Sequence, residues 1–388
     1  MFLGGALSPS SARRSEARFA VEADASDPKV HAREGLAYVQ RARDDADPSF
    51  LPRAESALQR SLDLQPADNL EAFVGMAALA NARHDFSGSV RWSRRAIRTN
   101  PYSASAYGLL GDALFELGRV RRADAAYQKM VDVRPDVASY VRASYALQHH
   151  GRTKDAIAAL RLALDAAGPA GDTAAWVRHQ LGDVYAGMGD YRQAARQNRI
   201  GTKVAPGYVP PTVGLAESLI ARGRLEDALE IMEVAANELP SLEYMITLGD
   251  LYAATGGRSD AEAQYATVAG KLAEYRRNGV LPDADFVVFY ADHGLRPGAA
   301  LGEARRIYRD RPTAKTADAL AWMLHSLGRD RRAWTLVAEA TRAAPGDADT
   351  LFHAGKIARS LGRDGSATRL IGEAMDLDPS LRFLTGRS

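Results

Sequence analysis

The run YGLLGDALFELGRVRRADAAYQKMVDVRP, at residues 107–135, predicts two α-helices joined by a tight turn. Its apolar and small residues recur at spacings of three and four, which is the period of one helical face. The first stripe consists of Tyr107, Leu110, Gly111 and Leu114, and the second of Ala123, Tyr127 and Met130. Gly118 lies where a left-handed residue would end the first helix. Pro135 cannot continue the second helix, so the stretch indicates a helical hairpin.

The same two markers return along the chain with a nearly constant period. The prolines are Pro66, Pro101, Pro135, Pro169, Pro206, Pro240, Pro312, Pro345 and Pro379, separated by 35, 34, 34, 37, 34, 72, 33 and 34 residues. The glycines are Gly118, Gly151, Gly189, Gly223, Gly256, Gly294, Gly328 and Gly362, separated by 33, 38, 34, 33, 38, 34 and 34 residues. Two independent markers with one period indicate an internal repeat, and such a chain grows by stacking similar units.

The repeat resembles the tetratricopeptide repeat family, in which large and small residues alternate along a helical hairpin of 34 residues. Further copies read LGDVYAGMGDYRQA (181–194), LAESLIARGRLEDA (215–228), LGDLYAATGGRSDA (248–261), LAWMLHSLGRDRRA (320–333) and HAGKIARSLGRDGSA (353–367). The resemblance covers roughly residues 30–380 and implies an all-α, right-handed α-solenoid of about ten helix-turn-helix repeats. The segment ARDDADPSFLPRAESALQRSLDLQP (42–66) also resembles bacterial multi-repeat proteins of undefined role, some of them exported.

Three regions are expected along the chain. Residues 1–28 are expected to form a disordered tail, or to carry the remnant of an export signal in the apolar stretch MFLGGAL (1–7). Residues 29–380 form the repeat array, and residues 381–388 a C-terminal tail. An irregular joint is expected near 270–300, where a second helix extends towards Asn278 and the cluster FVVFY (286–290) precedes Pro297. That joint is either a worn repeat or the site of a special contact.

The composition excludes several classes of function. The 50 basic and 48 acidic residues give a net charge of only +2, which does not favour a nucleic-acid partner. No run reaches the roughly 18 apolar residues of a membrane span. The absence of cysteine excludes disulfides and thiol catalysis. A cytoplasmic location is expected, or an extracytoplasmic one if residues 1–7 end a cut export signal.

The resemblance implies that the first helix of each repeat lines a concave groove. The residues predicted to bind a ligand there are Asp112, Tyr145, Trp176, His179, Asp183, Glu217, Asp250, Trp322, His325 and Lys356. The four carboxylates would create a negative potential inside the groove, which would suit a basic peptide. Alternatively, each acid that follows the repeat's glycine hydrogen-bonds the neighbouring repeat. The aromatic residues either anchor a partner or pack between helices.

No catalytic motif of the G-x-S-x-G, H-E-x-x-H, phosphate-loop or dinucleotide-binding type occurs in the sequence. The eight histidines show no metal-ligand spacing, so no catalytic, cofactor or metal site is predicted. The sequence therefore favours a non-enzymatic scaffold or adaptor that binds a protein or peptide, as a monomer or weak dimer. The alternative is a sensor of a small molecule or signalling peptide, with a closed pocket near 270–300. An enzyme, or an enzyme subunit with unrecognised chemistry, is a third hypothesis.

Overall fold

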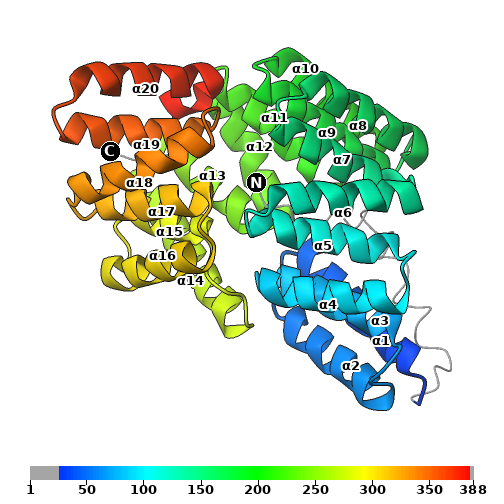
Figure 1. Ribbon diagram of the computed structural model, residues 1–388. Coiled ribbons are helices and arrows are strands. Elements are labelled where there is room, and N and C mark those ends of the chain that lie inside the picture. Colours follow the sequence, from blue (N-terminus) through cyan, green and yellow to red (C-terminus); the bar gives the residue numbers. More distant parts are fainter. Residues whose placement is uncertain (1–25, 385–388) are drawn as a thin grey trace. The chain divides into compact units, whose positions relative to one another are not determined.

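The computed structural model describes residues 26–384, and in that range it contains twenty α-helices and no strand (Figure 1). The first helices of the ten repeats are α1 (Pro28–Asp44), α3 (Leu70–Ala82), α5 (Ala104–Glu116), α7 (Val137–His149), α9 (Asp172–Gly187), α11 (Pro210–Ile220), α13 (Leu242–Ala254), α15 (Ala284–Asp292), α17 (Ala314–His325) and α19 (Ala348–Ser360). The second helices are α2 (Phe50–Leu64), α4 (Phe86–Thr99), α6 (Val120–Val133), α8 (Thr153–Ala167), α10 (Tyr191–Val204), α12 (Leu225–Glu238), α14 (Arg258–Arg277), α16 (Pro297–Asp310), α18 (Asp330–Ala343) and α20 (Asp364–Leu377). The predicted all-α array of ten helical hairpins is confirmed.

The turn between the two helices of a repeat requires a left-handed residue. All eight periodic glycines identified in the sequence have positive φ, between 61° at Gly294 and 89° at Gly256. The first two repeats lack this glycine, and Ala46 (φ 49°) and His84 (φ 59°) take the left-handed conformation instead. Each of the nine periodic prolines follows the last residue of a second helix by two positions, as Pro135 follows Val133, and α14 lacks such a proline. Glycine therefore ends the first helices and proline follows the second helices, as the sequence predicted.

Close packing within a repeat depends on a glycine in the first helix that faces a large residue of the second. A Cβ atom added to Gly111 would lie 2.4 Å from Cε1 of Tyr127, sixteen residues later. A Cβ atom on Gly249 would lie 2.5 Å from Cε1 of Tyr265, again sixteen residues later. The tyrosine ring thus occupies the space that a side chain on the opposite helix would need.

This packing predicts that replacing glycine with alanine lowers the free energy of unfolding at one helical position and raises it at another. Gly111→Ala forces a methyl group into the Tyr127 ring, and we expect a net loss of about 1–2 kcal/mol after the gain in helix propensity. Gly270→Ala in α14 meets no atom within 4 Å, and we expect a gain of about 0.5–1 kcal/mol. Urea unfolding followed by circular dichroism measures both changes. Midpoints that move in the same direction would contradict this account of the packing.

The helices divide between two packed units, which we describe separately. Unit 1 comprises residues 26–184, 194–214 and 273–281 of the described chain, and unit 2 comprises residues 185–193, 215–272 and 282–384. One core of unit 1 surrounds Leu51 and Leu58 of α2, and another surrounds Tyr127 of α6. Met232, Leu251 and similar side chains are buried in unit 2. Such a series of small cores between successive helices is typical of repeat proteins.

The region near 270–300, where we expected an irregular joint, departs from the regular repeat. Helix α14 has 20 residues, whereas α15 has only 9. Residues 273–281, at the end of α14 and just beyond it, pack within unit 1. The aromatic cluster at 286–290 is core, since Phe286, Phe289 and Tyr290 are 3%, 2% and 1% exposed.

Only parts of the predicted tails fall within the described residues. Residues 1–25 and 385–388 lie outside them, so the predicted N-terminal tail is almost wholly outside the described chain. A 3-10 helix, Pro379–Arg382, follows α20 and buries Leu381. The ring of Phe383 lies against the α11–α12 turn, 3.0 Å from where a Cβ of Gly223 would be. The apolar end of the array is therefore packed against unit 2.

Candidate partner-binding surface

The ten residues predicted to bind a partner differ strongly in exposure. Unit 1 contains Asp112, Tyr145, Trp176, His179 and Asp183, and unit 2 contains Glu217, Asp250, Trp322, His325 and Lys356. Three of them are buried, namely Asp112 (4% exposed), Asp250 (8%) and Trp322 (5%). Glu217 is exposed. The six others are partly exposed.

The Asp112 carboxylate is bonded inside the array. Its Oδ1 accepts from Nε of Arg142 at 2.9 Å, and its Oδ2 accepts from Nη2 of Arg142 at 2.8 Å. Tyr127 Oη also donates to Oδ1, at 3.2 Å. Burial acts to lower the pKa of Arg142, but the charge and hydrogen bonds of Asp112 outweigh it and raise that pKa. Burial and the same negative charge raise the pKa of Tyr127 well above its ordinary value. Asp112 is therefore hydrogen-bonded to the neighbouring repeat, which is the alternative to ligand binding that the sequence left open.

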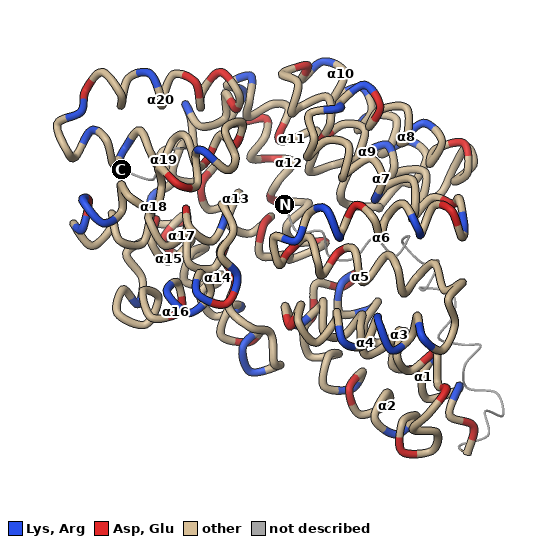
Figure 2. The backbone as a smooth tube through the Cα atoms, viewed as in Figure 1, with Lys and Arg blue, Asp and Glu red and all other residues tan. Residues whose placement is uncertain are grey.

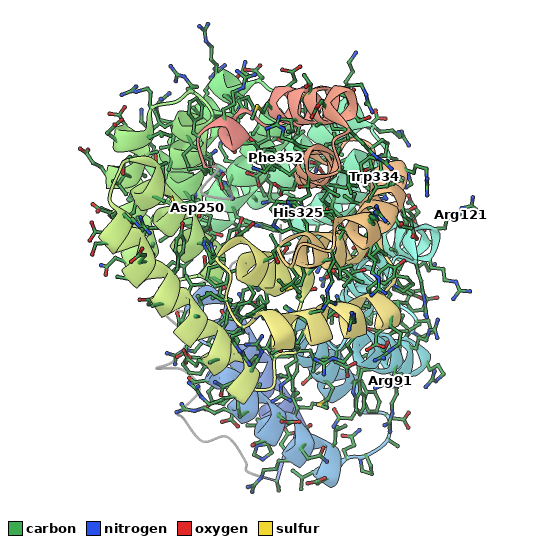
Figure 3. All side chains as sticks on the ribbon, turned by 90° about the vertical axis from the view of Figure 1, so that its left-hand side faces the viewer. Arg91, Arg121, Asp250, His325, Trp334 and Phe352 are labelled. Atoms are coloured by element: carbon green, nitrogen blue, oxygen red, sulfur yellow. The ribbon has the colours of Figure 1, made fainter. Side chains whose placement is uncertain are left out.

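The three other acids of the predicted groove have different surroundings. Asp250, labelled in Figure 3, accepts a hydrogen bond from Tyr265 Oη at 2.8 Å, which repeats the spacing of Asp112 and Tyr127. Asp183 accepts from Nε2 of Gln180 at 3.2 Å, and its side chain keeps 17% exposure. Glu217 lies exposed on α11. The accessible negative charge among these four positions therefore comes from Asp183 and Glu217.

Trp322 lies in a buried network between three first helices, α15, α17 and α19. Its indole Nε1 donates to Oδ1 of Asp292 at 2.7 Å, and its ring stacks on the His353 imidazole with centroids 4.0 Å apart. His353 Nδ1 is 2.9 Å from Oδ2 of Asp318. The sequence reasoning missed Asp292 and Asp318 as partners. The signal that could have found them is the repeat itself, since hydrogen-bonded residues here lie 30 or 35 positions apart.

The pKa values of His353 and Asp318 are both raised above their ordinary values. Burial acts to lower the pKa of His353, but the charge of Asp318 and the hydrogen bond to it outweigh burial and raise that pKa above 6.5. Asp349 and Asp292 act in the same direction. Burial raises the pKa of Asp318, so its carboxylate is costly unless His353 is protonated.

This shift predicts that stability depends on pH. A histidine with a raised folded pKa stabilises the protein fully below its unfolded value of about 6.5, and this contribution is lost as the pH rises through the folded pKa. We therefore expect the free energy of unfolding to fall as the pH rises from about 6.5 through the raised pKa of His353, and His353→Gln to remove that part of the fall. Urea titrations at several pH values measure it. His150→Gln, at a histidine with 47% side-chain exposure beside Asp124, is the matched control and should keep the wild-type slope.

Four of the predicted residues are partly exposed in unit 1, one on α7 and three on α9. Trp176, His179 and Asp183 are spaced by three and four residues, which places them on one face of α9. Tyr145 of α7 has the same position in its repeat as Asp183. Burial, followed by the charges of Glu116 and Asp112, raises the pKa of Tyr145. We call Tyr145, Trp176, His179 and Asp183 the α7–α9 patch.

Hydrogen bonds fix the polar part of this patch. His179 Nδ1 is 3.1 Å from Oδ1 of Asn198, a side chain that is only 1% exposed. The same nitrogen is 3.6 Å from Oδ1 of Asp183. The imidazole is thus held between a buried amide and a carboxylate, which leaves the orientation of His179 defined before any partner arrives.

In unit 2 the predicted residues are more scattered. His325 Nδ1 lies 2.6 Å from Oδ1 of Asp330. Lys356 of α19 is partly exposed. Figure 3 labels His325 and the buried Phe352 of α19, together with Arg91 and Arg121, which are exposed on second helices of unit 1. These positions do not form one patch comparable with that of α7 and α9.

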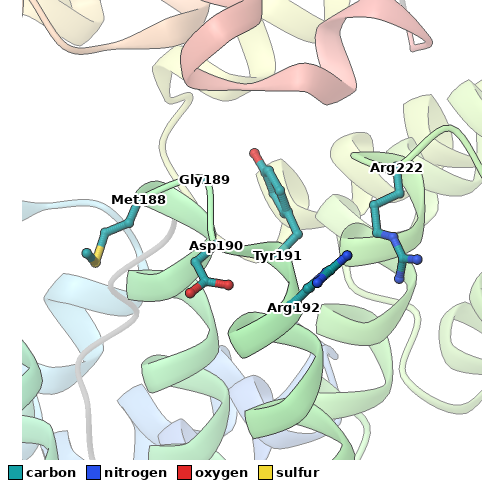
Figure 4. A pocket seen from close by; sticks show the side chains of 6 residues that line it. All are labelled: Met188, Gly189, Asp190, Tyr191, Arg192 and Arg222. Carbon is teal, nitrogen blue, oxygen red and sulfur yellow. The ribbon is translucent and has the colours of Figure 1, made fainter.

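Two open depressions lie at turns of unit 2. The first has a volume of about 430 Å³ and is lined by Met188, Gly189, Asp190, Tyr191, Arg192 and Arg222 (Figure 4). Burial, followed by the charge of Asp378, raises the pKa of Tyr191 to about 12. The second, of about 510 Å³, is lined by Gly328, Arg329, Asp330, Arg331, Arg332 and Leu361. Neither contains a residue predicted to bind a ligand, and neither lies near 270–300.

Charges of both signs are distributed over the whole described chain (Figure 2). Between residues 26 and 384, no group of three or more His, Asp or Glu side chains is arranged to hold a metal ion. In the same range, none of the helices combines the length and the apolar character needed to cross a bilayer.

Comparison with known proteins places the repeat in a family. The model of the tetratricopeptide repeat matches residues 104–137, which include α5 and α6. Subunit 7 of the anaphase-promoting complex of Arabidopsis thaliana is 25% identical over 196 residues, which cover 50% of this chain and 34% of that protein. The chain thus spans about a third of the length of this curated relative.

Solved structures give more distant matches. The human IFIT1 dimer with PPP-AAAA has 13% identity and a TM-score of 0.48, over 93% of this chain and 97% of that one. TTC0263, a thermophilic tetratricopeptide repeat protein of Thermus thermophilus, has 17% identity and a TM-score of 0.43, over 49% of this chain and 99% of that one. Residues 104–137 thus match the tetratricopeptide repeat model, and the same two-helix unit recurs from α1 to α20.

Proposed function

We propose that this protein is a scaffold or adaptor that holds a segment of another protein against the first helices of its repeats. Proteins with this fold generally mediate protein–protein interactions. The observation that carries the proposal is the α7–α9 patch, where a tryptophan, a tyrosine, a histidine and an aspartate remain partly exposed on the first helices of two successive repeats. Other predicted residues, such as Asp112 and Trp322, are used for packing.

The chemistry of the patch suits an extended protein segment. Trp176 and Tyr145 offer large apolar areas with few rotatable bonds, which is why such residues dominate binding energy in interfaces. Asp183, with His179 one turn before it, offers a carboxylate to main-chain amides or to a basic side chain of the partner. Within unit 1, a basic partner is supported by the partly exposed Asp183 and not by the buried Asp112.

Site-specific photo-crosslinking tests this proposal. A photoreactive phenylalanine analogue is placed at Trp176 in the patch, and at Leu162, a 50% exposed residue of α8, as the matched control in the same unit. We expect a partner protein to be crosslinked from a lysate of the source cells at position 176 and not at position 162. His179→Ala combined with Asp183→Asn should then weaken the purified complex by about tenfold or more, which corresponds to about 1.4 kcal/mol. Equal crosslinking at both positions, or unchanged affinity of the double variant, would contradict the proposal.

A further inference from the structure

We infer that the edge of the first two repeats is a docking site for an extended segment with a buried aliphatic anchor, and that the protein occupies this site with its own residues 278–281. The site lies at the turns between α1 and α2 and between α3 and α4. It is therefore a different surface from the α7–α9 patch, and the inference goes beyond the proposed function.

The α3–α4 turn holds the segment through both main-chain polar groups of one residue, Leu281. The amide of Leu281 donates to the carbonyl oxygen of Arg83 at 2.9 Å. The carbonyl oxygen of Leu281 lies 3.2 Å from Nδ1 of His84, which is 197 positions away in the sequence. His84 has positive φ (59°) in the α3–α4 turn. This turn thus offers an acceptor and a donor to one residue of an extended segment, which is how many peptide-binding sites capture a main chain.

Val280 supplies the apolar anchor. It is 3% exposed and belongs to the core cluster that includes Val39, Leu51 and Leu79. All the other buried residues of this cluster come from residues 39–109. The residues on both sides of Val280 are exposed: Gly279 lies at the surface, and Leu281 is 48% exposed. One buried side chain between two exposed residues is the pattern of a bound peptide rather than of a regular core helix.

The surroundings of the anchor also restrict what can bind. A Cβ atom on Gly279 would lie 3.1 Å from Nε of Arg83, and Gly279 has a φ of 84°, so the position before the anchor favours glycine. Arg83 Nη2 donates to Glu55 Oε2 at 2.8 Å, which fixes the guanidinium beside the segment. The site is therefore selective for a glycine followed by one buried aliphatic residue.

The end of α14 reaches the other turn of this edge. Tyr275 is partly buried against the same cluster. Burial, followed by the charges of Glu274 and Asp47, raises the pKa of Tyr275 to about 12. Asp47 lies in the α1–α2 turn, so Tyr275 is close enough to this turn for its charge to act on the phenol. A partner segment of the same chemistry would compete with the protein's own segment for this surface.

A binding measurement on the full-length protein tests the inference. The probe is a fluorescent peptide of residues 271–284, KLAEYRRNGVLPDA. Val280→Asp should release the internal segment because a carboxylate cannot enter the apolar cluster, and this variant should then bind the peptide. Wild-type protein should bind it at least about tenfold more weakly, since its site is already filled. The Leu281→Asp protein, changed at an exposed side chain beside the anchor, should behave like wild type. A control peptide with Val280→Asp should bind neither the wild-type protein nor the Val280→Asp protein.

Three results would overturn the inference. One is a Val280→Asp protein with a native circular dichroism spectrum that does not bind the peptide. Another is a wild-type protein that binds the peptide as tightly as the variant does. The third is a wild-type dimer that the peptide dissociates, because the segment would then bridge two copies. If Val280→Asp does not fold, the triple variant Gly279→Ser, Val280→Gly and Leu281→Ser, which inserts no charge, is tested with the same peptide and judged by the same criteria.

Discussion

Replacing Arg142 with methionine is expected to lower the free energy of unfolding of unit 1 by about 3–5 kcal/mol. Arg142 and Asp112 are both almost fully buried, with side chains 4% and 5% exposed, and they share two hydrogen bonds of 2.9 and 2.8 Å. Without the Arg142 guanidinium, the buried Asp112 carboxylate keeps only one of these two hydrogen-bonding residues, Tyr127. Chemical denaturation of the full chain, followed by circular dichroism, measures the loss.

Two further variants separate the ion pair from a general effect of the substitution. Arg134→Met removes an arginine whose side chain is 60% exposed and whose partner is Asp136, and it should cost less than about 1 kcal/mol. Asp112→Asn added to Arg142→Met removes the stranded charge and should restore part of the lost stability. An Arg142→Met protein as stable as Arg134→Met would show that Asp112 does not depend on this partner.

Replacing Trp322 with alanine is expected to destabilise unit 2 by about 3–5 kcal/mol, the usual cost of truncating a buried aromatic residue. Trp322 is 5% exposed, stacks on His353 and donates its indole N–H to Asp292. Its removal creates a cavity between α15, α17 and α19. Thermal unfolding of the full chain should show a lower temperature for the transition of this unit.

The matched control for this change is the same substitution at another predicted aromatic residue. Trp176 is partly exposed on α9, and Trp176→Ala should cost only about 1 kcal/mol. The two tryptophans should also differ in binding, because only Trp176 belongs to the proposed partner surface. An unchanged unfolding temperature for Trp322→Ala and a lowered one for Trp176→Ala would contradict this account. Trp176 would then be the packing residue, and Trp322 would not.

The helices were predictable from the sequence because their signals are local. Gly118 and Pro135 end helices through their own backbone geometry, and the stripes of apolar residues depend only on helical period. Repetition of these signals at a period of about 34 residues then predicts the array. The gap of 72 residues between Pro240 and Pro312 also shows that one periodic proline is missing.

The roles of individual side chains were less predictable, because each depends on the next repeat. Asp112 and Asp183 follow a glycine at the same repeat position, yet only Asp112 meets a buried arginine, Arg142, 30 residues later. Nothing near Trp322 in the sequence shows that Asp292 and His353 surround it. The contact between Leu281 and His84 spans 197 positions, and no local pattern predicts such a contact.

Hydrogen exchange of the full-length chain tests most directly whether the protein is built from ten stacked helical hairpins. We expect protected amides in twenty separate stretches that match α1 to α20, each beginning after the unpaired first turn of its helix. Protection should break at the glycine turns and after the periodic prolines. A long protected block that ran without interruption through Gly118 or Pro135, or protection with the two-residue alternation of strands, would contradict the account.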